Sequence, residues 1–290
     1  MKILDQHISN ALKEYGRKLV EHFKSDVISY MGIIHTTLLP QFIDFIENLS
    51  EKRLNNNRLV IFLTTPGGIV EAVEKMVEII RYYYKEVIFV VPDAAMSAGT
   101  IWCMSGDKIF MDYSSSLGPV DPQVPREDSG LVPALGYIDK VNEFIEKSKR
   151  SELSAAEYIL LKQLDLATLR RYEQARDLSI SLLKKWLVKY KFKDWNVHRT
   201  NKPNTPVTRQ EKEERAEQIA KALSDNNRWH SHGRMIGITT LKEILKIEIE
   251  DYSNETDLRY NIRAFHGLLS EVFEKQQLQL LLHDAGGMQI

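Results

Sequence analysis

The sequence contains a single cysteine, Cys103, among 290 residues. One thiol excludes an internal disulfide framework and a zinc site built from several cysteines, and it is compatible with a reducing compartment. An excess of charge of either sign is also missing, because 39 Lys and Arg are matched by 40 Asp and Glu, for a formal net charge of -1. A nucleic-acid-binding domain usually needs a strongly basic surface, so we expect no nucleic-acid partner.

Long apolar runs are absent as well. No stretch approaches the roughly 20 apolar residues that a membrane-spanning helix requires. The first residues, MKILDQHISNALKEYGRKLVEHF, carry charges throughout, whereas a secretory signal peptide has an unbroken apolar region. We therefore expect a cytoplasmic protein with no membrane span. Apolar residues at helical spacing between positions 5 and 24 predict an amphipathic helix that packs on the core or on another copy of the chain.

The first half of the sequence alternates between apolar, β-rich segments and segments with helical spacing. Four strands are predicted, at 26–34, 58–65, 86–91 and 107–112. Nearly continuous apolar strands separated by helices indicate an α/β fold with a parallel sheet. Such sheets bind ligands at the carboxyl ends of their strands.

The second half of the sequence lacks this alternation of strands and helices. Residues 135–190 are charged and helical, and the segment 152–191 forms one long helix or a helical hairpin. A polar loop at 198–210 and another helix follow. The segment TTLKEILKIEIE predicts a helix and a strand, and apolar spacing after residue 255 predicts a C-terminal helix. The whole chain is expected to contain four regions: an N-terminal helix (1–25), an α/β core (26–134), a helical insertion or arm (135–228), and a segment that returns to the core and ends in the C-terminal helix (229–290).

Two turns rich in glycine or alanine follow neighbouring strands. In TTPGG, the two glycines permit a sharp turn and leave amides uncovered at the start of a helix, where the dipole favours an anion. In PDAAMSAGT, Ser97 would stand at a helix start, with the amide of Ala98 facing the same space as the amide of Gly68. A hydroxyl beside two convergent N–H donors is the minimum layout for acyl transfer. The alternatives are an ordinary strand–helix turn and an ordinary N-cap serine among residues kept small for packing.

The motifs TTPGG, AAMSAGT and GDKIFMDYSSSLGPVDPQV, in this order, resemble the Clp protease/crotonase superfamily. The likeness is to its signal-peptide-peptidase-like branch, and within that branch to the serine dehydrogenase proteinase family. It covers roughly residues 25 to 125, and HGRMIGITTLKEILKIEIE resembles the family's late strand and helix more weakly. The resemblance implies a ClpP/crotonase-like fold, a parallel sheet of ββα units flanked by helices. It also implies a polypeptide substrate and a homo-oligomer, with no cofactor.

The resemblance implies roles for particular residues. Ser97 would be the acyl-forming nucleophile, and the amides of Gly68 and Ala98 would form the oxyanion hole. The substrate would add as a strand beside TTPGG, in contact with three residues: Gly67, Ile69 and Val70.

The general base is where the sequence departs from the family pattern. Clp-type enzymes take a histidine from the strand after the nucleophile helix, but this chain has none in IFMDYSSSLGP. Signal-peptide-peptidase-like enzymes use a lysine further along, where this chain has Lys140, Lys147 and Lys149. Lys140 is preferred because it lies on the apolar-patterned side of its segment. A lysine base must be neutral, and the alternative for each lysine is a solvated helix face.

The segment WHSHGRMI offers another base. His230 and His232 fall near the place where Clp-type enzymes have their triad aspartate, and histidine titrates in the useful range. Only two good ligands stand there, so we expect no metal. Three aspartates are candidates to orient a base or simply to cap and turn the chain: Asp107, Asp112 and Asp121.

Two other functions remain open at this point. A crotonase-like acyl-CoA hydrolase uses similar paired amides, although Ser97 would then be superfluous. A non-catalytic assembly or adaptor protein would keep the fold without a competent base.

Overall fold

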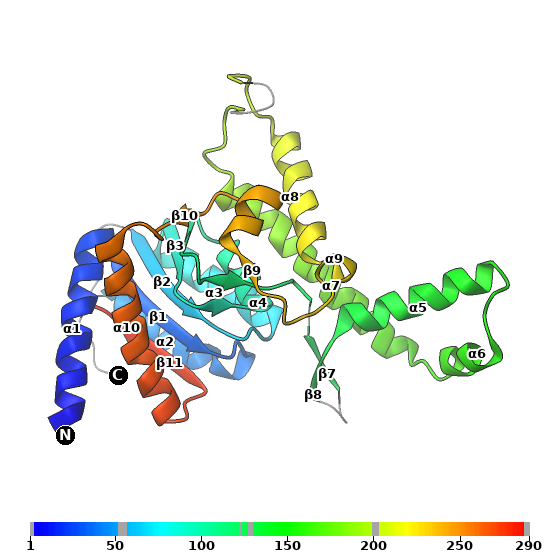
Figure 1. Ribbon diagram of the computed structural model, residues 1–290, viewed down its shortest axis with the longest axis horizontal. Coiled ribbons are helices and arrows are strands. Elements are labelled where there is room, and N and C mark those ends of the chain that lie inside the picture. The colour runs from blue at the N-terminus through cyan, green and yellow to red at the C-terminus, as the bar shows by residue number, and fades with distance from the viewer. Residues whose placement is uncertain (1–2, 52–56, 122, 127–129, 199–202, 287–290) are drawn as a thin grey trace.

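The computed structural model describes residues 3–51, 57–121, 123–126, 130–198 and 203–286 (Figure 1). At its centre lies a six-stranded sheet with the order β10-β5-β3-β2-β1-β11. Neighbouring strands are parallel except β1 and β11, which are antiparallel. The strands are β1 (Asp26–Gly32), β2 (Arg58–Thr64), β3 (Glu86–Val91), β5 (Lys108–Met111), β10 (Glu250–Asp251) and β11 (Leu280–Asp284).

Helices cover both faces of this sheet. Successive strand residues point to opposite sides, so Val60 and Phe62 of β2 join one apolar cluster while Leu59, Ile61 and Leu63 join the other. The first cluster is closed by α1 (Ile3–Phe23) and α10 (Thr256–Lys275), which lie side by side at the left of Figure 1. The second is closed by α2 (Leu39–Glu51), α3 (Val70–Tyr83) and α4 (Ala98–Cys103).

A small second sheet lies at the carboxyl ends of β2 and β3. Its order is β4 (Ala94–Ala95), β6 (Ser116–Leu117) and β9 (Ile236–Gly237), with β6 and β9 antiparallel. An isolated bridge between Thr65 and Ala95 joins it to the end of β2. This sheet therefore connects the two predicted turns to a segment more than a hundred residues further along the chain.

The predicted helical insertion contains several separate helices. After the hairpin of β7 (Gln123–Arg126) and β8 (Gly130–Pro133) come α5 (Ala134–Lys149), α6 (Ala155–Lys162) and α7 (Leu166–Trp186). The helical turn η2 (Leu187–Lys191) extends α7, followed by α8 (Arg209–Leu223) and α9 (Asn226–Trp229). Two more short turns are η1 (Thr36–Leu38) and η3 (Thr240–Ile244).

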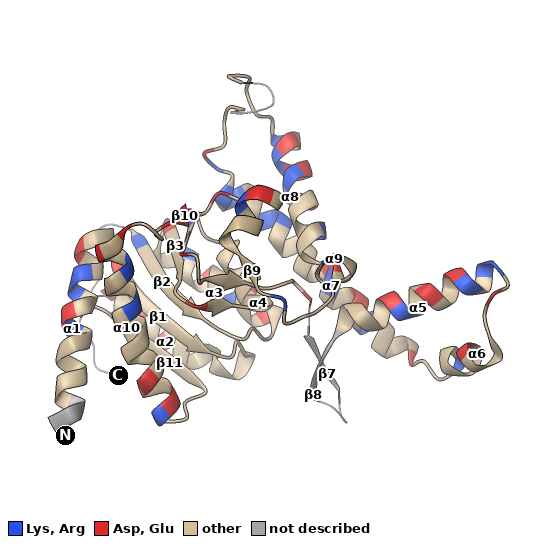
Figure 2. Ribbon diagram, in the orientation of Figure 1, with Lys and Arg blue, Asp and Glu red and all other residues tan. Residues whose placement is uncertain are grey.

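The insertion forms an arm because its first two helices point away from the sheet. In Figure 1, α5 and α6 project from the body and α7 returns toward it, and Figure 2 shows charges of both signs along α5. The carboxylate of Asp165 accepts hydrogen bonds from the amides of Ala167 and Thr168, so a new helix starts there. The stretch is therefore a helical hairpin and not one long helix.

The observed architecture confirms the α/β fold predicted from the sequence. All four predicted strands are present, as are the amphipathic N-terminal helix and the C-terminal helix α10. Beyond α10 the chain forms an additional strand, β11, in which alternate residues are buried. This strand pairs with β1 and completes the sheet.

Candidate active site

Ser97 occupies a strained turn between β4 and α4. Its backbone has φ 51° and ψ -114°, in a region that residues with a Cβ rarely adopt. Two hydrogen bonds hold the turn: the amide of Met96 donates to the Thr65 carbonyl at 2.9 Å, and the amide of Gly99 donates to the Met96 carbonyl at 2.8 Å. Such strain persists only where the surroundings enforce it, and it is concentrated at functional sites.

The small residues around Ser97 let α4 approach the end of β2. A Cβ added at Gly99 would lie 2.4 Å from the Thr65 methyl carbon. The hydroxyl of Thr100 lies 2.9 Å from the carbonyl oxygens of both Ala95 and Gly118, and it accepts from the Gly118 amide at 2.9 Å. Packing thus explains the alanines and glycines of AAMSAGT, and the same packing brings the serine turn against the TTPGG turn.

The TTPGG turn is fixed to the end of β1. The Ile34 amide donates to the Gly67 carbonyl, and the Ile69 amide donates to the Ile34 carbonyl, each at 2.9 Å. Because residues 67 and 69 face Ile34, the amide of Gly68 points away from it. A Cβ at Gly68, where φ is +148°, would lie 1.9 Å from the Ile34 oxygen. Only glycine fits this position.

The two predicted oxyanion donors stand on adjacent turns. A Cβ at Gly67 would lie 3.4 Å from the amide nitrogen of Ala98 and 2.9 Å from the Ser97 Cβ. Across the described residues, neither the Gly68 nor the Ala98 amide donates a hydrogen bond to the chain. Two amides that donate to no acceptor in the described part of the chain are chemically suited to bind an oxyanion.

The Ser97 hydroxyl is covered in this conformation. Its side chain donates to the main-chain oxygen of Asp121 at 3.3 Å, and the residue is only 3% exposed. Asp121 is buried to the same degree, and its Oδ1 accepts from the Leu135 amide in the first turn of α5 at 3.0 Å. The segment that follows β6 therefore lies directly over the nucleophile.

His232 lies opposite Asp121. Strands β6 and β9 pair Leu117 with Ile236 in antiparallel register, and the chain turns at His232 and Gly233 shortly before β9 begins. In this turn the His232 Nδ1 is 3.7 Å from the Asp121 Oδ2. His230 instead ends α9 with φ 60° and is exposed. Of the two predicted histidines, the fold thus brings His232 to the residue that contacts Ser97.

The three candidate lysines lie on the arm and face carboxylates. Lys140 is bound to Glu143 at 2.8 Å with its side chain 57% exposed, and Lys149 has a similar exposed partner. The amine of Lys147 lies 2.7 Å from Glu157, and hydrogen bonds to Glu157 and then Glu143 raise the pKa of that amine. No contact among the described residues joins any of these amines to the Ser97 hydroxyl. Carboxylate partners favour the charged amine, whereas a general base must be neutral.

The remaining predicted residues lie in structural surroundings. Val70 starts α3 and is buried in the core, and Ile69 before it is half-buried. Cys103 is fully buried at the end of α4, and burial raises the pKa of its thiol. Within the described ranges, no group of three or more His, Cys, Asp or Glu is arranged to hold a metal ion.

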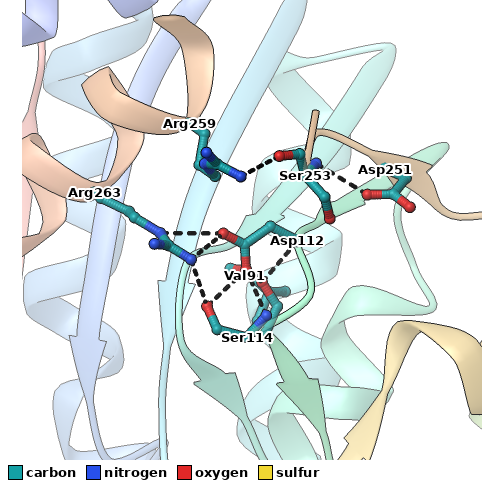
Figure 3. A network of polar contacts seen from close by, with 8 residues as sticks. Val91, Asp112, Ser114, Asp251, Ser253, Arg259 and Arg263 are labelled. Carbon is teal, nitrogen blue, oxygen red and sulfur yellow. Dashed lines mark hydrogen bonds and ion pairs between the residues drawn. The ribbon is translucent and has the colours of Figure 1, made fainter. Parts of the chain in front are cut away.

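The other two predicted aspartates stabilise the fold. Asp107 is bound by Arg81 at 2.9 Å and by Lys193 at 2.5 Å. Asp112, at the end of β5, is fully buried and receives Arg263 of α10 at 2.8 Å, as Figure 3 shows. Burial would raise the pKa of Asp112, but hydrogen bonds from Ser114 and the Arg263 guanidinium outweigh it and hold the pKa below its ordinary value.

Comparison with known proteins identifies the class to which this fold and serine turn belong. The model of the ClpP-like SDH-type serine proteinase family matches residues 23–201, which is more than half of the chain. The chain therefore belongs to this family, as the sequence motifs predicted.

Individual relatives are more distant. The uncharacterized proteins MJ0137 and MJ1495 of Methanocaldococcus jannaschii are 36% identical over 83 residues and 30% identical over 79 residues. These matches cover 29% and 27% of this chain, and it spans only 27% and 25% of the length of the two proteins.

Among solved structures, similarity extends to two proteases. The 1510-N membrane-bound stomatin-specific protease, solved with its serine 97 replaced by alanine, is 16% identical, covers 81% of this chain and 82% of its own, and has a TM-score of 0.44. ClpP1 from Listeria monocytogenes is 16% identical over 88% of this chain and 99% of its own, with a TM-score of 0.42. Separately, none of the helices within the described ranges combines the length and apolar character needed to cross a bilayer.

Proposed function

We propose that the protein is a serine peptidase in which Ser97 forms the acyl-enzyme. The proposal rests on the close approach of the Ser97 turn to the TTPGG turn. A strained serine on one turn approaches a double-glycine turn. The amides of Ala98 and Gly68, which donate to no acceptor among the described residues, belong to the same two turns. Membership of a serine proteinase family supports the same chemistry.

The reaction has two steps, formation of the acyl-enzyme and its hydrolysis. The Ser97 oxygen bonds to the peptide carbonyl carbon while its proton passes to the base, and the amides of Gly68 and Ala98 stabilise the oxyanion. The carbon–nitrogen bond then breaks, and the base returns the proton to the leaving amine. In the second step the oxygen of a water molecule bonds to the acyl carbon while the base takes a proton from the water. The ester bond to Ser97 then breaks, the base returns the proton to the serine oxygen, and the carboxylic acid product leaves. None of these steps requires a cofactor.

His232 is the base that the contacts favour. Its imidazole lies against Asp121, which contacts Ser97, whereas the lysines of α5 are paired with carboxylates. An imidazole can accept a proton near neutral pH without burial, whereas a lysine amine has to be desolvated first. We therefore assign the general-base role to His232 in preference to Lys140.

The substrate has to reach a hydroxyl that is covered. The segment from Gly118 to Asp121 lies over Ser97 in this conformation, so its displacement precedes attack on a peptide. The same burial favours a second candidate function, that of a non-catalytic assembly protein which keeps the fold.

A fluorophosphonate probe distinguishes the two functions. We expect the probe to label the native protein, with the adduct on Ser97 by peptide mapping, and we expect Ser97→Ala to abolish labelling. Ser179→Ala is the matched control, because Ser179 is equally buried but lies in α7 and donates to the Ala175 carbonyl. A native protein that is folded and unlabelled would favour the assembly function.

A further inference from the structure

Thr65, which directly follows β2, is bonded to both of the turns that form the candidate active site. Its amide donates to the Ala94 carbonyl and its carbonyl accepts from the Met96 amide, each at 2.9 Å, so its main chain brackets the start of the serine turn. Its hydroxyl accepts from the Gly67 amide at 3.0 Å. Its methyl carbon lies where a Cβ added at Gly99 would be only 2.4 Å away. A single buried side chain thus contacts the glycine turn and the first turn of α4.

The Thr65 hydroxyl also acts on the orientation of the Gly68 amide. The Gly67 carbonyl and the Gly68 N–H belong to one planar trans peptide unit and point in opposite directions, so a contact that holds the carbonyl also aims the amide. That carbonyl oxygen accepts from the Ile34 amide at 2.9 Å and lies 3.5 Å from the Thr65 hydroxyl oxygen. Because the same hydroxyl holds the Gly67 amide, it restrains a residue whose own backbone has the widest conformational freedom.

The Ala98 amide belongs to the other turn. Its peptide unit includes the Ser97 carbonyl, which accepts from the Ile101 amide within α4 at 3.2 Å. The distance of this amide from Gly68 therefore depends on how closely α4 approaches the end of β2, and the Thr65 methyl group is the surface that α4 meets there. Two donors bind an oxyanion well only when both lie within about 2.7–3.1 Å of it, so their spacing matters.

We infer that Thr65 is a positioning residue that sets the spacing and the orientation of the Gly68 and Ala98 amides. This inference rests on the proposed function and adds a residue to it. The hydroxyl of Thr65 bonds to Gly67 and acts on the oxyanion only through the two amides.

The preceding residue, Thr64, provides a matched comparison. Successive strand residues point to opposite faces of the sheet, so the Thr64 side chain points away from α4. Its buried hydroxyl oxygen has no hydrogen-bond partner among the described residues, whereas the hydroxyl of Thr65 accepts from Gly67. The two adjacent threonines thus differ in the contact on which the inference depends.

The first test measures fluorophosphonate labelling of the native protein, Thr65→Val and Thr65→Ser over a range of probe concentrations. Valine keeps the size and a methyl group and removes the hydroxyl, whereas serine keeps the hydroxyl. We expect Thr65→Val to lower the maximum labelling rate about tenfold or more, because the phosphoryl oxygen of the probe occupies the place of the oxyanion. The probe concentration at half-maximal rate should stay within about twofold, since that quantity reports binding before the reaction.

Rescue by serine separates positioning from a general loss of packing. Thr65→Ser should retain at least about a third of the native maximum rate. Thr64→Val should label within about twofold of the native rate, because it removes a hydroxyl that has no partner among the described residues. Circular dichroism checks that each variant is folded, and Thr65→Ala, which also lacks the hydroxyl, replaces Thr65→Val if valine is not accommodated.

The second test does not depend on activity. Hydrogen exchange of the Gly67 amide reports directly on its bond to the Thr65 hydroxyl. We expect this amide to exchange about tenfold or more faster in Thr65→Val and close to the native rate in Thr65→Ser, while the Ile61 amide in the middle of β2 changes little. A Gly67 amide that exchanges in the native protein as fast as in an unstructured peptide would overturn the inference without any variant.

The outcomes separate the inference from the proposed function. Labelling of native Ser97 together with a native maximum rate in Thr65→Val, or with equal losses in Thr65→Val and Thr65→Ser, would overturn the role of Thr65 and leave the peptidase proposal standing. An unlabelled native protein would overturn the peptidase proposal, and hydrogen exchange alone would then decide whether Thr65 fixes the glycine turn.

Discussion

Gly67 approaches Ser97 so closely that a Cβ added at Gly67 would lie 2.9 Å from the Cβ of Ser97 and 2.8 Å from the Met96 carbonyl oxygen. The residue also has φ +105°, which side chains other than hydrogen disfavour. We predict that Gly67→Ala displaces the serine turn and lowers the rate of fluorophosphonate labelling about tenfold or more, because small misplacements of reacting groups have large effects. Thermal unfolding should show a loss of about 1–3 kcal/mol.

The matched control for this substitution is Gly267→Ala in α10. Apart from its chain neighbours and its own helix backbone, no described atom would lie within 4 Å of the added Cβ, and the position is helical. We expect labelling to be unchanged and stability to rise by roughly 0.5–1 kcal/mol. If Gly67→Ala behaves like Gly267→Ala, the two turns do not constrain each other.

The lysines of α5 provide a second prediction. Lys140→Met and Lys147→Met should leave the labelling rate of Ser97 within about twofold of the native rate, because surface substitutions have small effects. His232→Gln should lower that rate roughly 100-fold or more through loss of the base. Labelling rates at pH 7.5 test both expectations. A large loss in Lys140→Met, together with a normal rate in His232→Gln, would return the role of base to the lysine.

The sequence predicted the parts of this site that depend on local patterns. The strands before TTPGG and AAMSAGT are continuous apolar runs, and the glycines signal the turns, so their meeting at one sheet edge follows from parallel α/β topology. The pairing of His232 with Asp121 could not be predicted in this way. It depends on β6 and β9, each only two residues long and more than a hundred residues apart in the chain, and such short strands carry no periodic signal.

The last strand was not predicted, and the sequence left the arm open between one long helix and a helical hairpin, for related reasons. The break before α7 depends on Asp165, a single capping residue within a long segment of strong helix formers. Strand β11 follows α10 almost directly, and its alternating burial appears only when it pairs with β1. Its preference is therefore set by tertiary contacts more than by its own residues.

A third prediction concerns the ion pair shown in Figure 3, between Asp112 and Arg263. Asp112→Asn removes the charge from a fully buried position and deprives the Arg263 guanidinium of its carboxylate. We expect a loss of about 2–4 kcal/mol in the free energy of unfolding, measured by urea titration at pH 7. Glu78→Gln, which breaks the exposed pair with Lys75, should cost less than about 1 kcal/mol. Equal losses in the two variants would contradict a structural role for the buried pair.

The fourth prediction is a pH dependence of stability that arises from His283. This residue lies in β11 against Phe265, and burial lowers the pKa of its imidazole to about 4. The folded protein thus keeps His283 neutral, whereas the unfolded chain takes up a proton near the ordinary pKa of about 6.5. The stabilisation is complete above pH 6.5 and is lost as the pH falls toward 4, by up to about 3 kcal/mol. His266, whose pKa burial also lowers, adds to the same trend.

His283→Leu removes this titration and isolates its contribution. We expect the free energy of unfolding of His283→Leu, measured by urea titration, to fall less between pH 7 and pH 4.5 than that of the native protein. His7→Gln alters an exposed histidine of α1 and should retain the native slope. Parallel pH slopes for the native protein and His283→Leu would mean that the imidazole is charged, or solvated, within the fold. In that case β11 would not be packed against β1 and α10 as tightly as its burial indicates, because a buried imidazole without a polar partner resists protonation.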